Sequence, residues 1–287
     1  MKSFILICLT GISLVAQQEN QNLKTLIATE FAFAASAAEI GTRDAFLKFI
    51  ADDGILFRPG PVNGKNFLST APKRPGLLSW YPAFAVISND GDLGFTTGPA
   101  DFRRDKDSAA IWFGNFCTIW QRQPNGEFKF VIDLGNSNEI PKKKLPPLKK
   151  ELLENKLEKF NNKGTESNPK ELFMIDEEFS KSNSNSSLAK VYKKYSDINS
   201  RILRDDSDLL LGNDEIQKYF AEKKIEYKFK PLGGKLSSSK DLGYVYGELI
   251  ISGEEEKSNG NYNYMHAWKK RGKDWFLLVD VANKVQK

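Results

Sequence analysis

The chain has 287 residues, 42 Lys and Arg, 37 Asp and Glu, and a net charge of +5. The positive excess lies in residues 136–170, where nine Lys face five Glu, whereas residues 17–135 carry twelve basic and thirteen acidic residues and residues 171–287 carry twenty and nineteen. This even distribution, without a basic stripe, argues against a nucleic-acid partner. With 40% hydrophobic residues, the chain has enough material for two domains of ordinary size.

The first sixteen residues combine Lys2, an apolar run and a small residue, Ala16, before Gln17. This pattern predicts a cleaved signal peptide over residues 1–16 and an exported protein, periplasmic or secreted. The run is shorter than the roughly 20 residues that span a bilayer, so we expect no membrane insertion after cleavage. Cleavage would remove Cys8 and leave Cys117 as the single thiol, which excludes an internal disulfide. Cys117 lies in an apolar run and is expected to be buried.

One pattern occurs twice, at residues 80–98 and 229–247. Both copies have an aromatic residue, a Pro two positions later, then Ser and, after three further residues, Asp-Leu-Gly-aromatic and a Gly three positions later. Further pairs repeat at offsets of 146 to 149 residues: Arg58 with Arg204, Gly64 with Gly212, Asp92 with Asp241, Trp120 with Trp268, and Asp133 with Asp280. One long period predicts a tandem pair of domains, not a solenoid.

In chain order, apolar spacing predicts a helix over residues 23–38 with Leu23, Leu26, Ile27, Phe31, Ala34, Ala35 and Ala38 on its buried face. Gly41 is expected to end it, and Thr42 to cap a second helix that buries Ala45, Phe46, Phe49 and Ile50. A short strand over residues 55–57 precedes the break at Pro59-Gly60-Pro61. From Trp80 onward, three or four antiparallel strands are expected, the last over residues 128–133. Helices followed by strands predict an α+β fold.

The predicted division is a first domain over residues 17–135, a basic linker rich in Pro and Lys over residues 136–170, and a second domain over residues 171–287. In the second domain, Leu172, Ile175 and Phe179 are expected on a first helix, and Val191, Tyr192 and Tyr195 on a second. Its sheet is expected to end with residues 263–269 and 275–280. We predict that the two copies fold alike and that their sheets pack together as an internal pseudo-dimer, hiding aromatic faces.

The helices, the short strand with its Pro/Gly break, Gly64, the Asp92-Leu-Gly signature and the segment from Trp120 to Asp133 together resemble the nuclear transport factor 2-like superfamily. Within it, the resemblance is to SnoaL-like and ketosteroid-isomerase-like domains of unknown function. It covers most of residues 24–135 and, more weakly, 171–282. The resemblance implies two cone-shaped α+β barrels, each with helices on a bent antiparallel sheet and an apolar pocket in its mouth.

The resemblance also implies where isomerase-type catalytic residues would lie. These positions are Ala34, Arg58 and Thr118 in the first copy and Ser180, Arg204 and His266 in the second. None is a carboxylate, and proton abstraction needs a base within hydrogen-bond reach. We therefore expect no isomerase mechanism and assign no catalytic residue. Asp92, Asp133, Asp241 and Asp280 are interpreted as turn or backbone-capping groups at strand ends.

Two interpretations of Arg58 and Arg204 remain open. A guanidinium where the pocket opens could grip a ligand carboxylate in a forked geometry. Alternatively, each arginine forms a structural ion pair with a carboxylate of the first helix, Glu30 in one copy and Asp176 in the other.

The remaining candidates are aromatic or close to the predicted pockets. His266 is the single histidine, and no spacing of Asp or Glu around it suggests a metal, so we expect neither a metal nor a cofactor. The aromatic residues could line a pocket or fill a core. The predicted ligand-binding residues are Arg58, Trp80, Thr118, Trp120, Arg204, Phe229, His266 and Trp268.

The sequence thus predicts an exported, non-enzymatic binding protein that holds a small ligand, anionic and partly apolar, in one or both cones. A SnoaL-like lyase, isomerase or hydrolase is an alternative that would need a titrating base in the pocket. A structural or interaction module, built as an internal pseudo-dimer, is the other.

Overall fold

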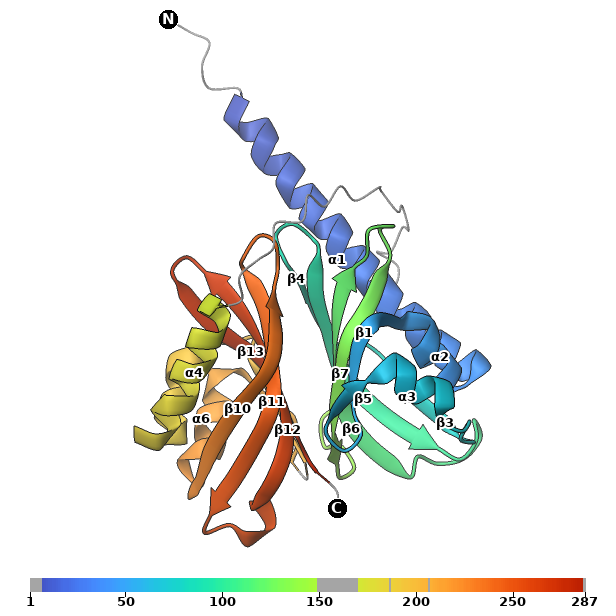
Figure 1. The fold of residues 1–287 in the computed structure, drawn as a ribbon. Helices are drawn as coiled ribbons and strands as arrows, with labels where there is room; N and C mark the ends of the chain where they lie inside the picture. The colour runs from blue at the N-terminus through green and yellow to red at the C-terminus, as the bar shows by residue number, and fades with distance from the viewer. Residues whose placement is uncertain (1–6, 149–169, 186, 206, 286–287) are drawn as a thin grey trace, which may run out of the picture.

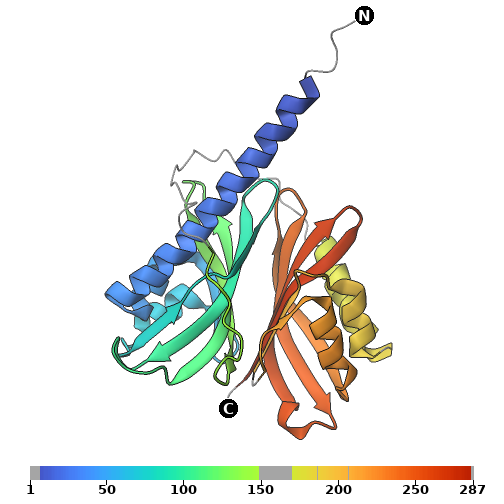
Figure 2. The same ribbon diagram turned by 180° about the vertical axis from the view of Figure 1, so that it is seen from behind.

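A computed structural model describes residues 7–148, 170–185, 187–205 and 207–285. Most of the predicted linker therefore lies outside the described residues. The helices and strands form four layers, with the two sheets facing each other and the helices outside (Figures 1 and 2).

The first domain begins with three helices and two strands and continues into antiparallel strands, of which the last three are long. Its elements are α1 (Ile7–Ile40), α2 (Thr42–Phe49), β1 (Ile50–Phe57), β2 (Pro61–Asn63), α3 (Gly64–Thr70), β3 (Leu77–Trp80), β4 (Phe84–Ile87), β5 (Leu93–Arg103), β6 (Trp112–Arg122) and β7 (Phe128–Asn138). The sheet order is β2-β1-β7-β6-β5-β3, and β4 also pairs with β5. β1 and β7 are parallel, whereas the other pairs are antiparallel.

The second domain repeats this topology. Its elements are α4 (Lys170–Asn185), α5 (Leu188–Tyr195), β8 (Arg201–Arg204), β9 (Leu210–Leu211), α6 (Gly212–Ala221), β10 (Ile225–Leu236), β11 (Leu242–Gly253), the short 3₁₀ helix η2 (Glu256–Ser258), β12 (Gly260–Arg271) and β13 (Asp274–Lys284). Read from β9, the order β9-β8-β13-β12-β11-β10 matches that of the first sheet. The predicted α+β fold and the predicted duplication are therefore confirmed.

The repeated sequence pattern occupies the same place in both sheets. Trp80 pairs with Ala100, and Phe229 pairs with Leu249, which lies 149 residues after Ala100. The repeated prolines mark an irregular edge: Pro82 separates β3 from β4, and the register of β10 shifts just after Pro231. Proline has no N–H to donate to a ladder, so an edge or a bulge is where a sheet accommodates it.

Two details of the first helices differ from the prediction. The buried face of α1 contains Leu26, Glu30, Phe33 and Ala37, so it is rotated from the predicted face, and Ala35 and Ala38 are exposed. Hydrophobic spacing missed this face because a carboxylate lies in the middle of it. The cap of α2 is Gly41 at φ 87°, not Thr42, and it makes no side-chain hydrogen bond. This backbone conformation suits glycine because it has no Cβ.

α1 also runs through the predicted cleavage site at Ala16. No helix in the described part of the chain is both long enough and apolar enough to span a membrane. The signal peptide and export remain predictions.

Three apolar cores hold the layers together. One lies under the helices of each domain, and the third lies between the two sheets. This intersheet core joins Phe95, Cys117 and Ile119 of the first sheet to Tyr244 and Met265 of the second. Non-polar side chains on the face of each sheet that is turned away from its own helices are thus removed from water by the other domain.

The Ser and Asp residues of the repeated pattern connect the domains reciprocally. Asp92 Oδ2 accepts hydrogen bonds from Ser238 N at 2.9 Å and Ser238 Oγ at 2.7 Å. Asp241 in turn accepts from Asn89 N at 3.3 and 3.2 Å. Asn89 and Ser238 are equivalent, so these contacts follow a two-fold relation, as in an isologous dimer interface. The interpretation of Asp92 and Asp241 as capping groups needs one correction: each caps the turn of the other domain.

Candidate functional site

Each domain places a carboxylate on the buried face of its first helix. Glu30 follows Leu26 by four residues and precedes Phe33 by three, and Asp176 has the same spacing from Leu172 and Phe179. Residues at these spacings share one side of a helix. Both carboxylates are therefore directed into the core, where both are 0% exposed.

Glu30 is held by donors from the sheet of its own domain. It accepts hydrogen bonds from Trp80 Nε1 at 2.6 Å, from Trp120 Nε1 at 2.9 Å and from the hydroxyl of Thr96. Burial raises the pKa of Glu30 to about 7, although these hydrogen bonds act in the opposite direction. No cation contacts it among the described residues, so Glu30 is a poorly neutralised buried acid.

The second carboxylate of the first domain is Asp133, which lies opposite Thr118 in the pairing of β7 with β6. Thr118 Oγ1 donates a hydrogen bond to Asp133 Oδ2 at 2.7 Å. Burial raises the pKa of Asp133 to about 6, while this hydrogen bond and the charge of Arg58 partly offset the increase. A group with such a pKa changes charge close to neutral pH.

Arg58 follows β1 and lies at the mouth of the first cone. Its Nη1 donates to the backbone oxygen of Phe57 at 2.5 Å, and its guanidinium lies 5.8 Å from the ring centre of Phe67. No carboxylate oxygen lies within 4 Å of it in the described part of the chain. Arg58 is exposed. It does not form the ion pair that a structural role would require.

Asp133 and Arg58 both line a cavity of about 540 Å³ in the first cone. This volume is within the range of small-molecule sites. Its rim includes residues of the second domain, among them Asn263, Asn283 and Lys284. The apolar wall is formed by Phe33, Phe46, Leu56, Leu78, Trp80, Ala100, Trp112 and Phe116.

The equivalent place in the second domain holds a chain of buried charges. His266 Nδ1 lies 2.6 Å from Asp176 Oδ1, and His266 Nε2 lies 3.4 Å from Asp280 Oδ1. Arg204 Nη2 donates to Asp280 Oδ2 at 2.5 Å. All four side chains are at most 5% exposed.

Hydroxyl and indole groups donate further hydrogen bonds to these carboxylates, whereas Asp280 Oδ1 and His266 Nε2 have no hydrogen-bond partner among the described residues. Asp176 accepts from Tyr264 OH at 3.0 Å and from Trp268 Nε1 at 2.9 Å, and Asp280 accepts from Tyr192 OH at 2.5 Å. Burial alone would lower the pKa of His266, but Asp176 and Asp280 outweigh it and raise this pKa to about 9. Burial alone would raise the pKa of Asp280, but the charges of Arg204 and His266 outweigh the effect of burial and lower this pKa. At neutral pH, His266 is thus a second cation beside Asp280, in addition to Arg204.

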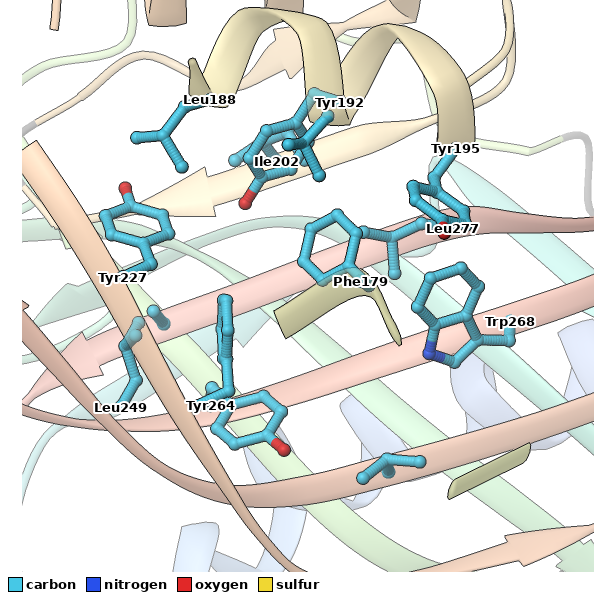
Figure 3. Packing of buried hydrophobic residues seen from close by; sticks show 14 of the residues in the cluster. Phe179, Leu188, Tyr192, Tyr195, Ile202, Tyr227, Leu249, Tyr264, Trp268 and Leu277 are labelled. Atoms are coloured by element: carbon cyan, nitrogen blue, oxygen red, sulfur yellow. The ribbon is translucent and has the colours of Figure 1, made fainter. Parts of the chain in front are cut away.

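The second cone is filled because larger side chains replace smaller ones at matching positions. Leu78 corresponds to Tyr227, Ala100 to Leu249 and Thr118 to His266. Tyr227, Leu249 and His266 are all buried, and Phe179, Tyr192, Tyr264 and Trp268 pack in the same region (Figure 3). At the positions that line the cavity of the first domain, the described side chains of the second domain thus pack in one buried cluster.

The predicted ligand-binding residues therefore lie in different environments. Arg58 and Trp80 line the cavity, whereas Thr118 and Trp120 are fully buried behind it and bind Asp133 and Glu30. The four from the second domain lie inside its core and are at most 7% exposed: Arg204, Phe229, His266 and Trp268.

Two sequence interpretations were wrong. Neither arginine pairs with the carboxylate of the first helix, because Glu30 is bound by Trp80, Thr96 and Trp120, and Arg204 pairs with Asp280. Asp133 and Asp280 are not turn or capping groups, because both lie within long strands. The sequence signal for these two residues is their recurrence at an offset of 147 residues. It does not reveal their role, because only the pairing with β6 and β12 places Asp133 opposite Thr118 and Asp280 opposite His266.

The described residues contain no group of three or more His, Cys, Asp or Glu side chains suited to a metal ion. Cys117 is fully buried, and burial holds the pKa of its thiol well above the usual value. A buried neutral thiol is a poor nucleophile.

Comparisons with known proteins identify similar folds. No protein-family model matches the chain, and no curated protein matches it. A putative calcium/calmodulin dependent protein kinase II association domain from Xanthomonas campestris is 14% identical over 42% of this chain and 90% of its own, with a TM-score of 0.37. An NTF2-like protein from Cytophaga hutchinsonii is 12% identical over 42% of this chain and 100% of its own, with a TM-score of 0.35.

A third similar structure, an NTF2-like protein involved in plasmid conjugation, covers 94% of this chain and 95% of its own at 8% identity, with a TM-score of 0.21. At such identities the likeness concerns the fold alone. The order of helices and strands is the same in both halves of this chain, so one α+β fold is present in two tandem copies.

Proposed function

We propose that this protein is an exported, non-enzymatic binding protein that holds a small, partly apolar ligand in the cone of its first domain. The observation that carries the proposal is the cavity of about 540 Å³, which combines an aromatic wall with Asp133 and Arg58. Ligand sites are typically concave, mostly apolar and provided with a few polar groups. The second domain contributes part of the rim and fills its own cone with side chains.

The internal repeat supplies the variant that tests this function. Ala100 lines the cavity, and its counterpart Leu249 is fully buried in the filled cone. Ala100→Leu should therefore reduce the volume of the first cavity with a side chain that the same position accepts in the second copy. The matched control is Ala109→Leu, the same change at an exposed position.

The experiment is a thermal-shift and calorimetric screen of small aromatic and aliphatic molecules against the full chain. We expect at least one ligand whose binding is lost in Ala100→Leu and retained in Ala109→Leu. Ligands that bind both variants equally would place binding elsewhere and contradict the proposal.

A proton-transfer enzyme is a second candidate, because one observation favours it. Asp133 lies in the cavity wall, and its pKa is raised to about 6 by burial, as suits a general base near neutral pH. The two functions differ in their effect on a bound ligand. In D₂O, an enzyme of this kind would exchange a carbon-bound ligand proton for deuterium, and Asp133→Asn would abolish the exchange. A binding protein would leave the ligand's NMR spectrum unchanged.

A further inference from the structure

The two copies of the strand aspartate differ in how many donors they have. Asp280 is approached by Arg204 and Tyr192, each at 2.5 Å, and by His266 at 3.4 Å. In the described structure, the carboxylate of Asp133 has one hydrogen-bond donor, Thr118, and no ion pair within 4 Å. The same position is thus occupied by an arginine and a tyrosine hydroxyl in one domain and faces a cavity in the other.

Each missing donor has an identifiable cause. Phe46 corresponds to Tyr192 and has no hydroxyl group, and Thr118 corresponds to His266 and has no ring. Arg58 corresponds to Arg204 but is turned toward Phe57 O and the ring of Phe67. The space left by these differences is part of the cavity, which both Phe46 and Asp133 line.

The two interiors also differ in charge. In the second domain, His266 and Arg204 balance Asp176 and Asp280. In the first, Glu30 and Asp133 are the corresponding acids, and the nearby cation that acts on Asp133 is the exposed Arg58. An unbalanced carboxylate next to aromatic faces is an environment that attracts a cation, because the faces of aromatic rings carry partial negative charge.

We propose that the ligand of the first cone carries a nitrogen cation, a protonated amine or imidazole on an apolar body, which binds Asp133 in the place that His266 and Arg204 take beside Asp280. This inference rests on the proposed function, because it assumes that the cavity binds a ligand. The charge of the ligand is inferred from the second domain, where the cationic side chains of His266 and Arg204 occupy the equivalent site. The apolar body would lie against Trp80 and Phe116, and Arg58 would remain at the rim.

The test uses three probes of similar size: tryptamine, which is a cation, tryptophol, which is neutral, and indole-3-propionate, which is an anion. Titration calorimetry of the full chain at pH 7.5 should show tryptamine binding about tenfold or more tighter than either analogue. Asp133→Asn should weaken tryptamine by about 30-fold or more, as expected for loss of one partner of a desolvated charge pair, and should leave tryptophol unchanged.

Two further variants separate the possible outcomes. Thr118→His introduces the imidazole of the second copy next to Asp133 and should exclude tryptamine, whereas Arg58→Ala should leave its affinity equal or higher. The charge assignment would be overturned if indole-3-propionate bound most tightly and its binding depended on Arg58. Tryptamine binding that persists in Asp133→Asn would also overturn it. If a neutral or anionic probe binds more tightly than tryptamine and its binding is lost in Ala100→Leu, the binding function stands while this inference fails. If no probe binds, the inference fails.

Discussion

Arg204 reaches the carboxylate of Asp280 at 2.5 Å, whereas Arg58, at the matching position in the first domain, has no carboxylate within 4 Å in the described structure. Arg204 therefore has a structural role, whereas the guanidinium of Arg58 is not engaged in an ion pair. Arg204 is 4% exposed, and each nitrogen of its guanidinium donates a hydrogen bond. Arg58 is exposed at the rim of a cavity.

Replacing each arginine by methionine should have unequal effects on stability. Arg204→Met leaves the buried Asp280 with an unbalanced charge and should cost about 3 to 5 kcal/mol of unfolding free energy. Arg58→Met breaks no ion pair and should change it by about 0.5 kcal/mol or less. Urea unfolding of both variants beside the wild type measures the difference. Equal losses would mean that Arg58 also has a structural partner.

Glu30→Gln should stabilise the first domain at neutral and higher pH. The folded-state pKa of about 7 lies above the ordinary value of 4.5, so wild-type folding is least penalised below pH 4.5 and loses stability as pH rises toward 7. The amide has no charge to bury, so at pH 8 the variant should be more stable by about 1 to 3 kcal/mol. Urea unfolding followed by tryptophan fluorescence at pH 4.5 and 8 tests this. A variant that is less stable at pH 8 would show that the ionised carboxylate is needed.

His266 should titrate far above an ordinary histidine. Its pKa is about 9 when folded and 6.5 when unfolded, so the stability it contributes is fully present below pH 6.5 and is lost as pH rises through about 9. Because it is the single histidine in the chain, its imidazole resonances are unambiguous by NMR. Titration at or below 6.5 would mean that a neutral ring links Asp176 and Asp280.

The reciprocal contacts between the domains should be energetically coupled. Asp92→Ala removes the acceptor for the N–H and hydroxyl of Ser238, and Asp241→Ala removes the acceptor for Asn89 N–H. Each should cost about 1 to 2 kcal/mol, and the double variant should cost less than their sum because both contacts support one interface. A urea double-mutant cycle measures this, with the exposed Asp107→Ala as a control. Strict additivity would indicate independent contacts.

Affinity for a cationic ligand should depend on pH through Asp133. Ionised Asp133 attracts a cation, and its pKa is about 6, so tryptamine affinity should fall as pH decreases through 6. The groups that face Asp133 are Thr118 from β6, Arg58 after β1 and Glu30 from α1, and of these Glu30 also titrates near neutral pH. Calorimetry from pH 5 to 8 on wild type and Glu30→Gln distinguishes the two acids. A pH dependence that disappears in Glu30→Gln would assign the effect to Glu30.

The sequence by itself determined the duplication and the fold class. Fixed offsets between Trp120 and Trp268, or between Asp92 and Asp241, survive in one chain because each pair occupies the same place in two copies of a sheet. The alternation of side chains along strands and the positions of turns are local properties, so a linear pattern can carry them. Even so, the buried face of α1 was missed because Glu30 interrupts its apolar spacing.

Only the tertiary structure decided which cone is open. The sequence contains Leu78, Ala100 and Thr118 in one copy and Tyr227, Leu249 and His266 in the other, but these three positions lie on three different strands and meet only when the sheet is formed. The same holds for Arg204 and Asp280, which are 76 residues apart, and for Glu30 and Trp120, which are 90 apart. Cavity volume and the pairing of buried charges depend on distances between such remote segments, because interiors are close-packed and a carboxylate is neutralised only by a cation that reaches it.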